Sequence, residues 1–298
     1  MLGFLRVAAL SQNESLPLQK RLKRAAAAGE NKFAASDFSR SGKKFFKERK
    51  SLRKKVAFFR RSCYNVVMSI YAIGDLHLSF DDAKPMDVFG SAWSGHFDKI
   101  RADWKNKVQP EDTVLIPGDI SWAMKLSDGL KDLARLKDFP GKKIFIKGNH
   151  DFWWNGITKL RDGAPDQSFY FLQTDAVRLD HKVYAGSRGW TCPGSADFSA
   201  EDEKLYRRES ERFRLALNCA KELSEEGDEL IALIHYPPFS LRSPDTEFTK
   251  LFEEYGVKKV IFGHLHGAGY FPFYTEKNGV KYYLTSCDKT NFSLTKIE

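Results

Sequence analysis

The sequence predicts an α/β fold for the part of the chain that follows residue 68. Short runs rich in Ile, Val, Leu and Phe recur along this part, and polar residues follow each run at once, mostly after a glycine. Between the runs, apolar residues repeat at spacings of three and four, as they do in amphipathic helices. Strands that alternate with helices are typical of α/β architecture.

Five of the apolar runs are expected to be strands. They lie at 69–73, 113–116, 143–146, 229–234 and 259–262. Each is apolar at nearly every position, which is typical of strands that are buried on both faces of a sheet.

Four helices are expected between the strands. Apolar positions at helical spacing indicate the first three: Phe97, Ile100 and Trp104; then Leu130, Leu133 and Ala134; then Phe213, Leu217, Ala220 and Leu223. Ser127 is expected to cap the second helix, and Gly227 is expected to end the third. Ser243 and Pro244 indicate the start of the fourth, with proline at its first helical position, and Gly256 indicates its end.

Charge divides the chain into two regions. Residues 1–67 hold 17 Lys and Arg against 4 Asp and Glu, so all of the net charge of +9 comes from this segment. The remainder holds 31 basic and 35 acidic residues and is mildly acidic. We therefore expect a basic extension at 1–67, disordered or outside the functional protein, and one domain at 69–298.

Three interpretations of the extension stay open. It could tether the protein to nucleic acid or to an anionic membrane. It could be a targeting peptide, because such segments are basic and poor in acidic residues. It could also be dispensable, because the first strand and its motif follow Met68 directly. The third interpretation is favoured.

Composition indicates a globular protein without a membrane span. Hydrophobic residues make up 42% of the chain and charged residues 29%, and no run approaches 18 consecutive apolar residues. The four cysteines are scattered and include no CxxC pair, which fits free thiols in a reducing compartment. The expected location is the cytoplasm.

Side chains that can bind metal follow all five expected strands. They are Asp75, His77, Asp119, Asn149, His150, Asp151, His235, His264 and His266. Alone, Asp75, Asp119 and Asn149 could be turn residues, His235 a structural histidine, and His264 and His266 a surface pair. Five groups in the same position after five strands favour a common site instead. In α/β sheets ligands bind beyond the carboxyl ends of the strands, so we expect these residues to converge in space.

The donor set favours two divalent ions. Imidazole nitrogens and carboxylate or amide oxygens, without thiolates, suit Mn, Fe, Zn or Co. The candidates are more numerous than one tetrahedral ion requires. Paired ions about 3.5–4 Å apart can bind a phosphoryl group and ionise a water molecule, and peptide hydrolysis by paired metals follows the same logic.

Five motifs resemble the signature of the calcineurin-like metallophosphoesterases. They are Asp75-Leu76-His77, Gly118-Asp119, Gly148-Asn149-His150-Asp151, His235, and Gly263-His264-Leu265-His266. Gly-Asn-His-Asp and Gly-His-x-His in this order are highly specific, whereas Asp-x-His alone is weak. The resemblance covers 69–298. Within the family, the sequence most resembles the bacterial predicted-phosphohydrolase branch. It implies a metallo-dependent phosphatase fold, a four-layer αββα sandwich of two mixed sheets flanked by helices.

The resemblance also implies a role for each residue of the site. Asp75, His77 and His266 would hold the first ion, Asn149, His235 and His264 the second, and Asp119 would bridge the two. A hydroxide that bridges the ions would attack phosphorus, His150 would protonate the leaving oxygen, and Asp151 would orient His150. The implied activity is the hydrolysis of a phosphoester.

The sequence departs from the Ser/Thr protein phosphatases of the superfamily, which carry Asp-Arg three residues after the bridging aspartate. Trp122 and Ala123 stand at those positions, so an arginine that would bind substrate phosphate is missing. A small phosphomonoester or phosphodiester is the expected substrate. Two alternatives stay open: a nuclease with the basic extension as its tether, and a metal-bound scaffold without activity.

Several other residues are weaker candidates for the site. Trp93, Trp122, Trp153, Trp154 and Trp190 are expected mainly to pack, although some could form an aromatic rim. His96 could contribute to a pocket, and Arg188 could reach a phosphate. Arg207 and Arg208 are expected to lie on a solvated helix face.

Overall fold

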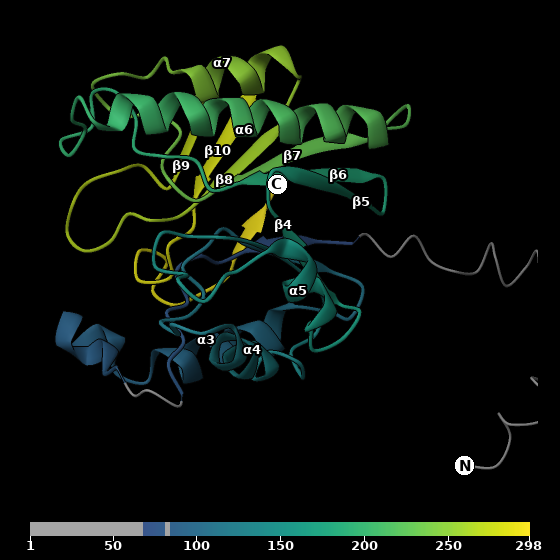
Figure 1. The fold of residues 1–298 in the computed structure, drawn as a ribbon. Coiled ribbons are helices and arrows are strands. Elements are labelled where there is room, and N and C mark those ends of the chain that lie inside the picture. Colours follow the sequence, from purple (N-terminus) through teal and green to yellow (C-terminus); the bar gives the residue numbers. More distant parts are fainter. Residues whose placement is uncertain (1–67, 81–83) are drawn as a thin grey trace, which may run out of the picture. The chain divides into compact units, whose positions relative to one another are not determined.

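Two β-sheets lie face to face between two layers of helices in the computed structural model, which describes residues 68–80 and 84–298 (Figure 1). This arrangement confirms the predicted αββα sandwich. The basic segment 1–67 lies outside the described residues, so the expectation that it is separable from the domain stays a prediction.

The first sheet has five strands in the order β11-β1-β2-β3-β4. Their bounds are β1 (Ile70–Ala72), β2 (Thr113–Ile116), β3 (Lys142–Ile146), β4 (Phe169–Leu172) and β11 (Thr295–Ile297). Strands β1 to β4 are parallel, and β11 runs antiparallel beside β1. The parallel pairing brings the carboxyl ends of β1, β2 and β3 to one edge.

The second sheet has six strands in the order β5-β6-β7-β8-β10-β9. Their bounds are β5 (Asp175–Leu179), β6 (Lys182–Ser187), β7 (Glu229–Ile234), β8 (Lys259–Phe262), β9 (Tyr274–Lys277) and β10 (Val280–Leu284). The four inner strands are parallel, and β5 and β9 are antiparallel edge strands. Both sheets are therefore mixed, as predicted.

Helices cover the outer face of each sheet (Figure 1). On the first sheet they are α3 (His96–Lys107), α4 (Leu126–Ala134) and α5 (Ile157–Asp162), and on the second α6 (Asp202–Leu223) and α7 (Glu247–Glu254). Two short 3₁₀ helices, η2 (Met86–Phe89) and η3 (Ser91–Trp93), precede α3. The helices α3, α6 and α7 bury apolar side chains toward the sheets, for example Ile100 and Trp104 of α3.

An apolar layer joins the two sheets. Leu115 and Ile144 of the first sheet and Ile231 and Leu233 of the second are fully buried in this layer. Gly186 lets the sheets approach, because a Cβ atom there would lie within 3.0 Å of side-chain atoms of the first sheet. Each buried aliphatic side chain contributes about 1.5–3 kcal/mol, so this layer holds the two sheets, and hence the two halves of the site, in place.

Two expected helix starts are wrong. Helix α4 begins at Leu126, and Ser127 lies inside its first turn instead of capping it. Helix α7 begins at Glu247, because Thr246 caps it through a reciprocal pair of hydrogen bonds with Thr249. That pair satisfies two backbone N–H groups in a way that the preceding serine and proline cannot.

No helix within 68–80 and 84–298 combines the length and the apolar character needed to cross a membrane.

Cys192, Cys219 and Cys287 are free thiols, as expected from their spacing, and Cys63 lies outside the described residues.

Candidate metal centre

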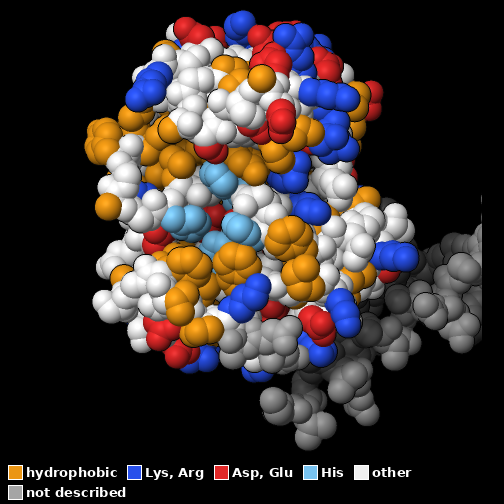
Figure 2. Space-filling view, turned by 60° about the vertical axis from the view of Figure 1, so that its left-hand side comes forward, with side chains coloured by type: hydrophobic (Ala, Val, Ile, Leu, Met, Phe, Trp, Pro, Cys, Tyr) orange, Lys and Arg blue, Asp and Glu red, His pale blue; other side chains and the backbone are white. Residues whose placement is uncertain are grey.

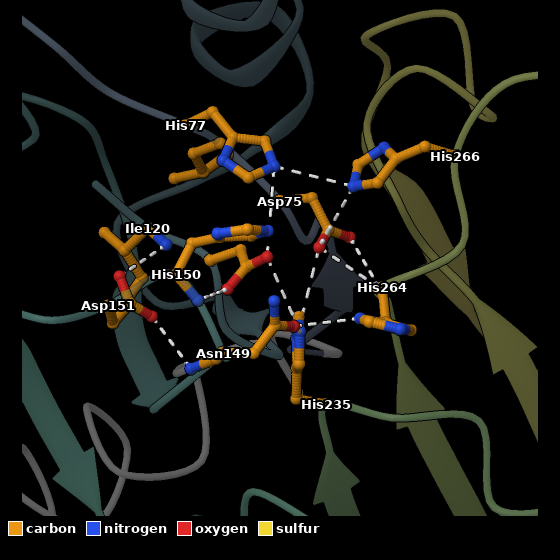
Figure 3. A network of polar contacts seen from close by, with 12 residues as sticks. Asp75, His77, Ile120, Asn149, His150, Asp151, His235, His264 and His266 are labelled. Atoms are coloured by element: carbon orange, nitrogen blue, oxygen red, sulfur yellow. Dashed lines mark hydrogen bonds and ion pairs between the residues drawn. The ribbon is translucent and has the colours of Figure 1, made fainter. Parts of the chain in front are cut away.

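The nine predicted site residues meet at one place, beyond the carboxyl ends of β1, β2, β3, β7 and β8 (Figure 3). The first sheet supplies Asp75, His77, Asp119 and the 149–151 turn, and the second supplies the remaining three histidines. Segments about 190 positions apart in the sequence thus converge: His77 contacts His266, and His264 contacts Asp75.

Backbone hydrogen bonds hold the first two loops side by side. The amide of Asp75 donates to the carbonyl of Gly118 at 3.0 Å, and the amide of His77 donates to the carbonyl of Asp119 at 3.0 Å. The amide of His264, from the other sheet, donates to both carboxylate oxygens of Asp75 at 3.1 Å. These bonds orient the side chains before any ligand binds.

Four of the site residues have left-handed backbone conformations. Their φ angles are 59° at Asp75, 46° at His77, 51° at Asp119 and 73° at His264. Left-handed conformations are uncommon for residues with a side chain, and they cluster at functional sites because the surrounding structure can maintain the strain there. The positive φ angles turn these side chains inward from the strand ends.

Gly148 gives the third loop room to approach the second. A Cβ atom at this position would lie within 3.0 Å of both the backbone nitrogen and the carboxylate of Asp119. We expect Gly148→Ala to lower the free energy of unfolding by about 3 kcal/mol, the upper end for overpacking, because the contacted atom is backbone. Chemical denaturation would measure this loss.

Gly156→Ala is the matched control, because a Cβ atom there meets nothing within 4 Å and the residue has a negative φ. If Gly148→Ala were as stable as Gly156→Ala, the close approach of the two loops would be wrong.

One group of donors comprises Asp75, His77 and His266, whose potential ligand atoms all lie within 4.8 Å of one another. His77 Nε2 lies 3.5 Å from His266 Nε2, and His266 Nε2 lies 3.7 Å from Asp75 Oδ1. This is the set predicted for the first ion.

The second group comprises Asp75, Asp119 and His235, within the same distance of one another. His235 Nε2 lies 2.6 Å and His264 Nδ1 lies 2.9 Å from the side-chain oxygen of Asn149. Asp119 Oδ2 lies 3.5 Å from His235 Nε2 and 3.9 Å from His77 Nε2. Asp119 therefore faces both predicted sets, although Asp75 is the residue that the two groups share.

The imidazole tautomers show that the donor set fits cations. His235 Nδ1 lies 2.8 Å from the carbonyl of Pro117, and a carbonyl only accepts hydrogen bonds, so Nδ1 carries the proton. The Nε2 lone pair of a neutral His235 then points at the oxygen of Asn149, which has no proton to share. His77 directs Nε2 toward the site, 3.5 Å from His266 Nε2. Lone pairs that converge in this way are stabilised by a cation.

The charges of the site point the same way. Burial tends to raise the pKa of Asp75, but the His266 ring 3.7 Å away and the charges of the neighbouring imidazoles hold that pKa well below its usual range. Burial, followed by the charge of Asp75, raises the pKa of Asp119 to about 8. Burial lowers the pKa of His77 and of His264 to about 3 in each case. Metal binding requires carboxylates and neutral imidazoles, so the low pKa values of Asp75, His77 and His264 favour it. The raised pKa of Asp119 reflects burial beside a second carboxylate, which is an unfavourable arrangement that a cation would relieve.

His150 and Asp151 lie beside these donors, but they do not form the expected pair. Asp151 is fully buried and accepts hydrogen bonds from the amides of Gly148, Ile120 and Ser121 and from the Trp153 indole, at 2.8–3.1 Å. Within the described residues no hydrogen bond joins Asp151 to the His150 ring. The expected contact is absent because four other donors already occupy the carboxylate.

Asp288 is a residue of the site that the sequence analysis missed. Its carboxylate lies 2.8 Å from His266 Nδ1 and accepts a hydrogen bond from the amide of Gly267 at 2.9 Å. Burial tends to lower the pKa of His266, but its hydrogen bond to Asp288 and the nearby carboxylate of Asp75 raise that pKa to about 10. The sequence does carry a signal for Asp288, because a polar cluster follows the apolar strand β10, as it follows the strands that were predicted.

Aromatic side chains surround the donors. Trp122 stacks on His77 with ring centroids 4.8 Å apart, and Tyr236 packs on His264 at 4.3 Å. Trp153 and Trp154 are buried and pack beneath the 149–151 turn, which resolves the alternative left open from the sequence.

The weaker candidates lie outside the donor set. His96 Nε2 lies 3.1 Å from the carbonyl of Leu76 and packs against Trp93. Arg188 lies over the Trp190 ring and 3.7 Å from Glu209. Arg207 is exposed on α6 and pairs with Glu203, as expected for a solvated face.

One comparison with known proteins identifies a family. The sequence model of the calcineurin-like phosphoesterases matches residues 68–268. No curated protein matches the chain significantly. Among solved structures, a protein of unknown function from Aquifex aeolicus shares 14% identity, with a TM-score of 0.41, over 77% of this chain and 95% of its own.

Proposed function

Because the chain belongs to the calcineurin-like phosphoesterase family, we propose that it hydrolyses small phosphomonoesters or phosphodiesters. Members of this family use divalent metals, and we propose that this chain binds two such ions. The observation that carries this proposal is the convergence of seven nitrogen and oxygen donors from five strand ends. One tetrahedral ion would leave several of these buried donors without a partner.

The donors divide between two positions. Asp75, His77 and His266 would hold one ion, Asn149, His235 and His264 the other, and Asp119 would serve both. When bound, such a pair neutralises the charge of a phosphoryl group and lowers the pKa of a water molecule. Asp288 positions His266 through Nδ1, and the Pro117 carbonyl positions His235 in the same way, so each ring presents Nε2 to the site.

His150 is placed to act as the general acid. Its ring is half-buried and makes no hydrogen bond to another described residue, while its amide donates to Asp119 Oδ1 at 2.8 Å. A water oxygen forms a bond to phosphorus and releases a proton to solvent as the bond to the ester oxygen breaks. The ester oxygen retains the electron pair and takes the proton of the His150 imidazolium, and the imidazole is protonated again from solvent.

Asp151 acts on the shape of the third loop. By accepting from the amides of Gly148, Ile120 and Ser121, its carboxylate ties the 148–151 turn to the loop that carries Asp119. Asp151 is therefore a positioning residue, and its effect reaches His150 through the backbone.

We expect the full chain with Mn²⁺ to hydrolyse p-nitrophenyl phosphate or bis(p-nitrophenyl) phosphate, and EDTA to abolish this activity. A chain that starts at Met68 should fold, and its kcat/KM should equal that of the full chain at both 50 and 200 mM salt. If the extension tethered nucleic acid, its deletion would weaken DNA binding and remove a steep dependence of that binding on salt. An insoluble or inactive Met68 chain would show that residues 1–67 belong to the working protein.

A further inference from the structure

A cavity opens beside the His77 and His266 side of the metal centre. Its volume is about 300 Å³. We call it the ring pocket; it is lined by His77, Met86, Phe89, Trp93, Trp122, His150, His266, Gly267 and Asp288. Three histidines of the site thus form one wall, and the segment that contains η2 and η3 supplies the opposite one.

Most of the other lining side chains are apolar. Trp122 packs against both His77 and His150, with ring centroids 4.8 and 4.6 Å apart, and its indole donates to the Met86 sulfur. Phe89 is 64% exposed although it lines the pocket, so it lies at the entrance. Figure 2 shows hydrophobic side chains gathered beside the histidines.

Apart from the histidines, which the proposed function assigns to the ions and to the leaving oxygen, the ring pocket offers no cation to a substituent. Among the described residues no Lys or Arg lines it, although Lys84 Nζ lies 4.8 Å from the centroid of the Trp122 ring. The one carboxylate in the lining, Asp288, is already bonded to His266 and to the amide of Gly267. A charged substituent would lose its hydration here without a partner, whereas an apolar one would gain from burial.

The position of His150 decides which part of a substrate would enter. A second cavity of about 470 Å³ lies on the other side of the metal centre, where His264, Tyr236, Arg242 and Tyr270 line it. His150 lines the ring pocket and not this second cavity. Since a general acid must lie next to the oxygen that it protonates, the leaving group occupies the ring pocket.

We propose that the ring pocket binds the leaving group of the substrate, and that this group is uncharged and carries an apolar ring. The inference rests on the proposed function, because it takes His150 as the acid. It restricts the substrate class: esters of ring-bearing alcohols should be preferred to esters of short or charged alcohols.

Phosphonates test the proposal by binding alone, because they are not hydrolysed. In calorimetry on the Mn²⁺-loaded full chain, benzylphosphonate should bind about tenfold more tightly than ethylphosphonate, since the ring removes additional apolar surface from water. Cyclohexylmethylphosphonate distinguishes the source of the gain: weaker binding than benzylphosphonate indicates an aromatic ring, and equal binding indicates any apolar ring. Equal affinity for the benzyl and ethyl compounds would overturn the proposal.

Two exposed aromatic residues provide matched variants. Phe89→Ala should reduce the preference for the benzyl compound to less than about threefold, whereas Tyr270→Ala, at a side chain that is 83% exposed in the second cavity, should leave it unchanged. The reverse pattern would place the ring in the second cavity and refute the assignment.

Failure of the proposed function would look different. If the benzyl preference held but benzyl phosphate and ethyl phosphate were both stable in the presence of the protein, hydrolysis would be wrong: the pocket would bind an apolar ring, but not as a leaving group. If both esters were hydrolysed with equal kcat/KM and both phosphonates bound equally, the pocket assignment alone would be wrong.

Discussion

Replacing His150 with alanine should lower kcat for benzyl phosphate by about 10²–10⁴-fold, the usual contribution of a general acid, and should leave the metal content unchanged. The ring makes no hydrogen bond to another described residue, and only the backbone amide of His150 contacts Asp119. Truncation therefore removes the proton donor without removing a ligand. The loss should be much smaller for p-nitrophenyl phosphate, because nitrophenolate leaves without a proton.

His181→Ala is the control for this variant. His181 is 84% exposed at the turn between β5 and β6, far along the chain from every site loop. Its truncation should change neither kcat nor metal content. Loss of metal in His150→Ala, measured by elemental analysis, would show that His150 is a ligand; an equal loss for the two esters would argue against proton donation.

Replacing Asp119 with asparagine should weaken the binding of both ions by more than about 100-fold, beyond the effect usual for residues that only orient a ligand, and should abolish hydrolysis. The substitution retains the volume of the side chain and removes its charge. Because Asp119 faces His77 on one side and His235 on the other, both positions lose their common carboxylate. Calorimetric titration with Mn²⁺ would measure both affinities.

Asp112→Asn is the matched control for the loss of a buried carboxylate. Asp112 precedes β2, at the opposite end of the strand that leads to Asp119, and accepts hydrogen bonds from the amides of Ser69 and Gln109 at 2.8 Å. It should lower stability and leave metal affinity unchanged. Asp119→Asn with undiminished binding of either ion would show that this carboxylate is not shared.

The sequence was sufficient to predict the strands that build the site. The runs that became β1, β2, β3, β7 and β8 are apolar at nearly every position because both faces of each strand are buried, one against the other sheet and one against helices. That burial is visible in the sequence without any tertiary information, and the polar residues that follow mark where each strand ends.

The remaining strands were not predicted, and for the two edge strands of the second sheet the reason is physical. Strand β5 is half-buried throughout and β9 alternates between exposed and half-buried positions, so neither gives a continuous apolar run. Their hairpins carry a local signal: Asn278 and Gly279 between β9 and β10 both have positive φ angles, as an Asn-Gly hairpin turn requires. Asp288 was missed with them, since it follows β10.

Contacts inside the site could be predicted only in part. Convergence followed from the rule that parallel strands present their carboxyl ends at one edge, and the structure places all nine candidate residues there. The hydrogen-bond partners of the side chains could not be predicted from this rule. The family resemblance implied that Asp151 supports His150, but the buried carboxylate lies among backbone amides of two loops and bonds to them instead.

Anomalous diffraction from crystals of the full chain grown with Mn²⁺ tests the central claim most directly. We expect two peaks about 3.5–4 Å apart, one beside Asp75, His77 and His266, the other beside Asn149, His235 and His264, with Asp119 in contact with both. A single peak, or a pair of peaks that Asp119 does not touch, would contradict the two-ion centre.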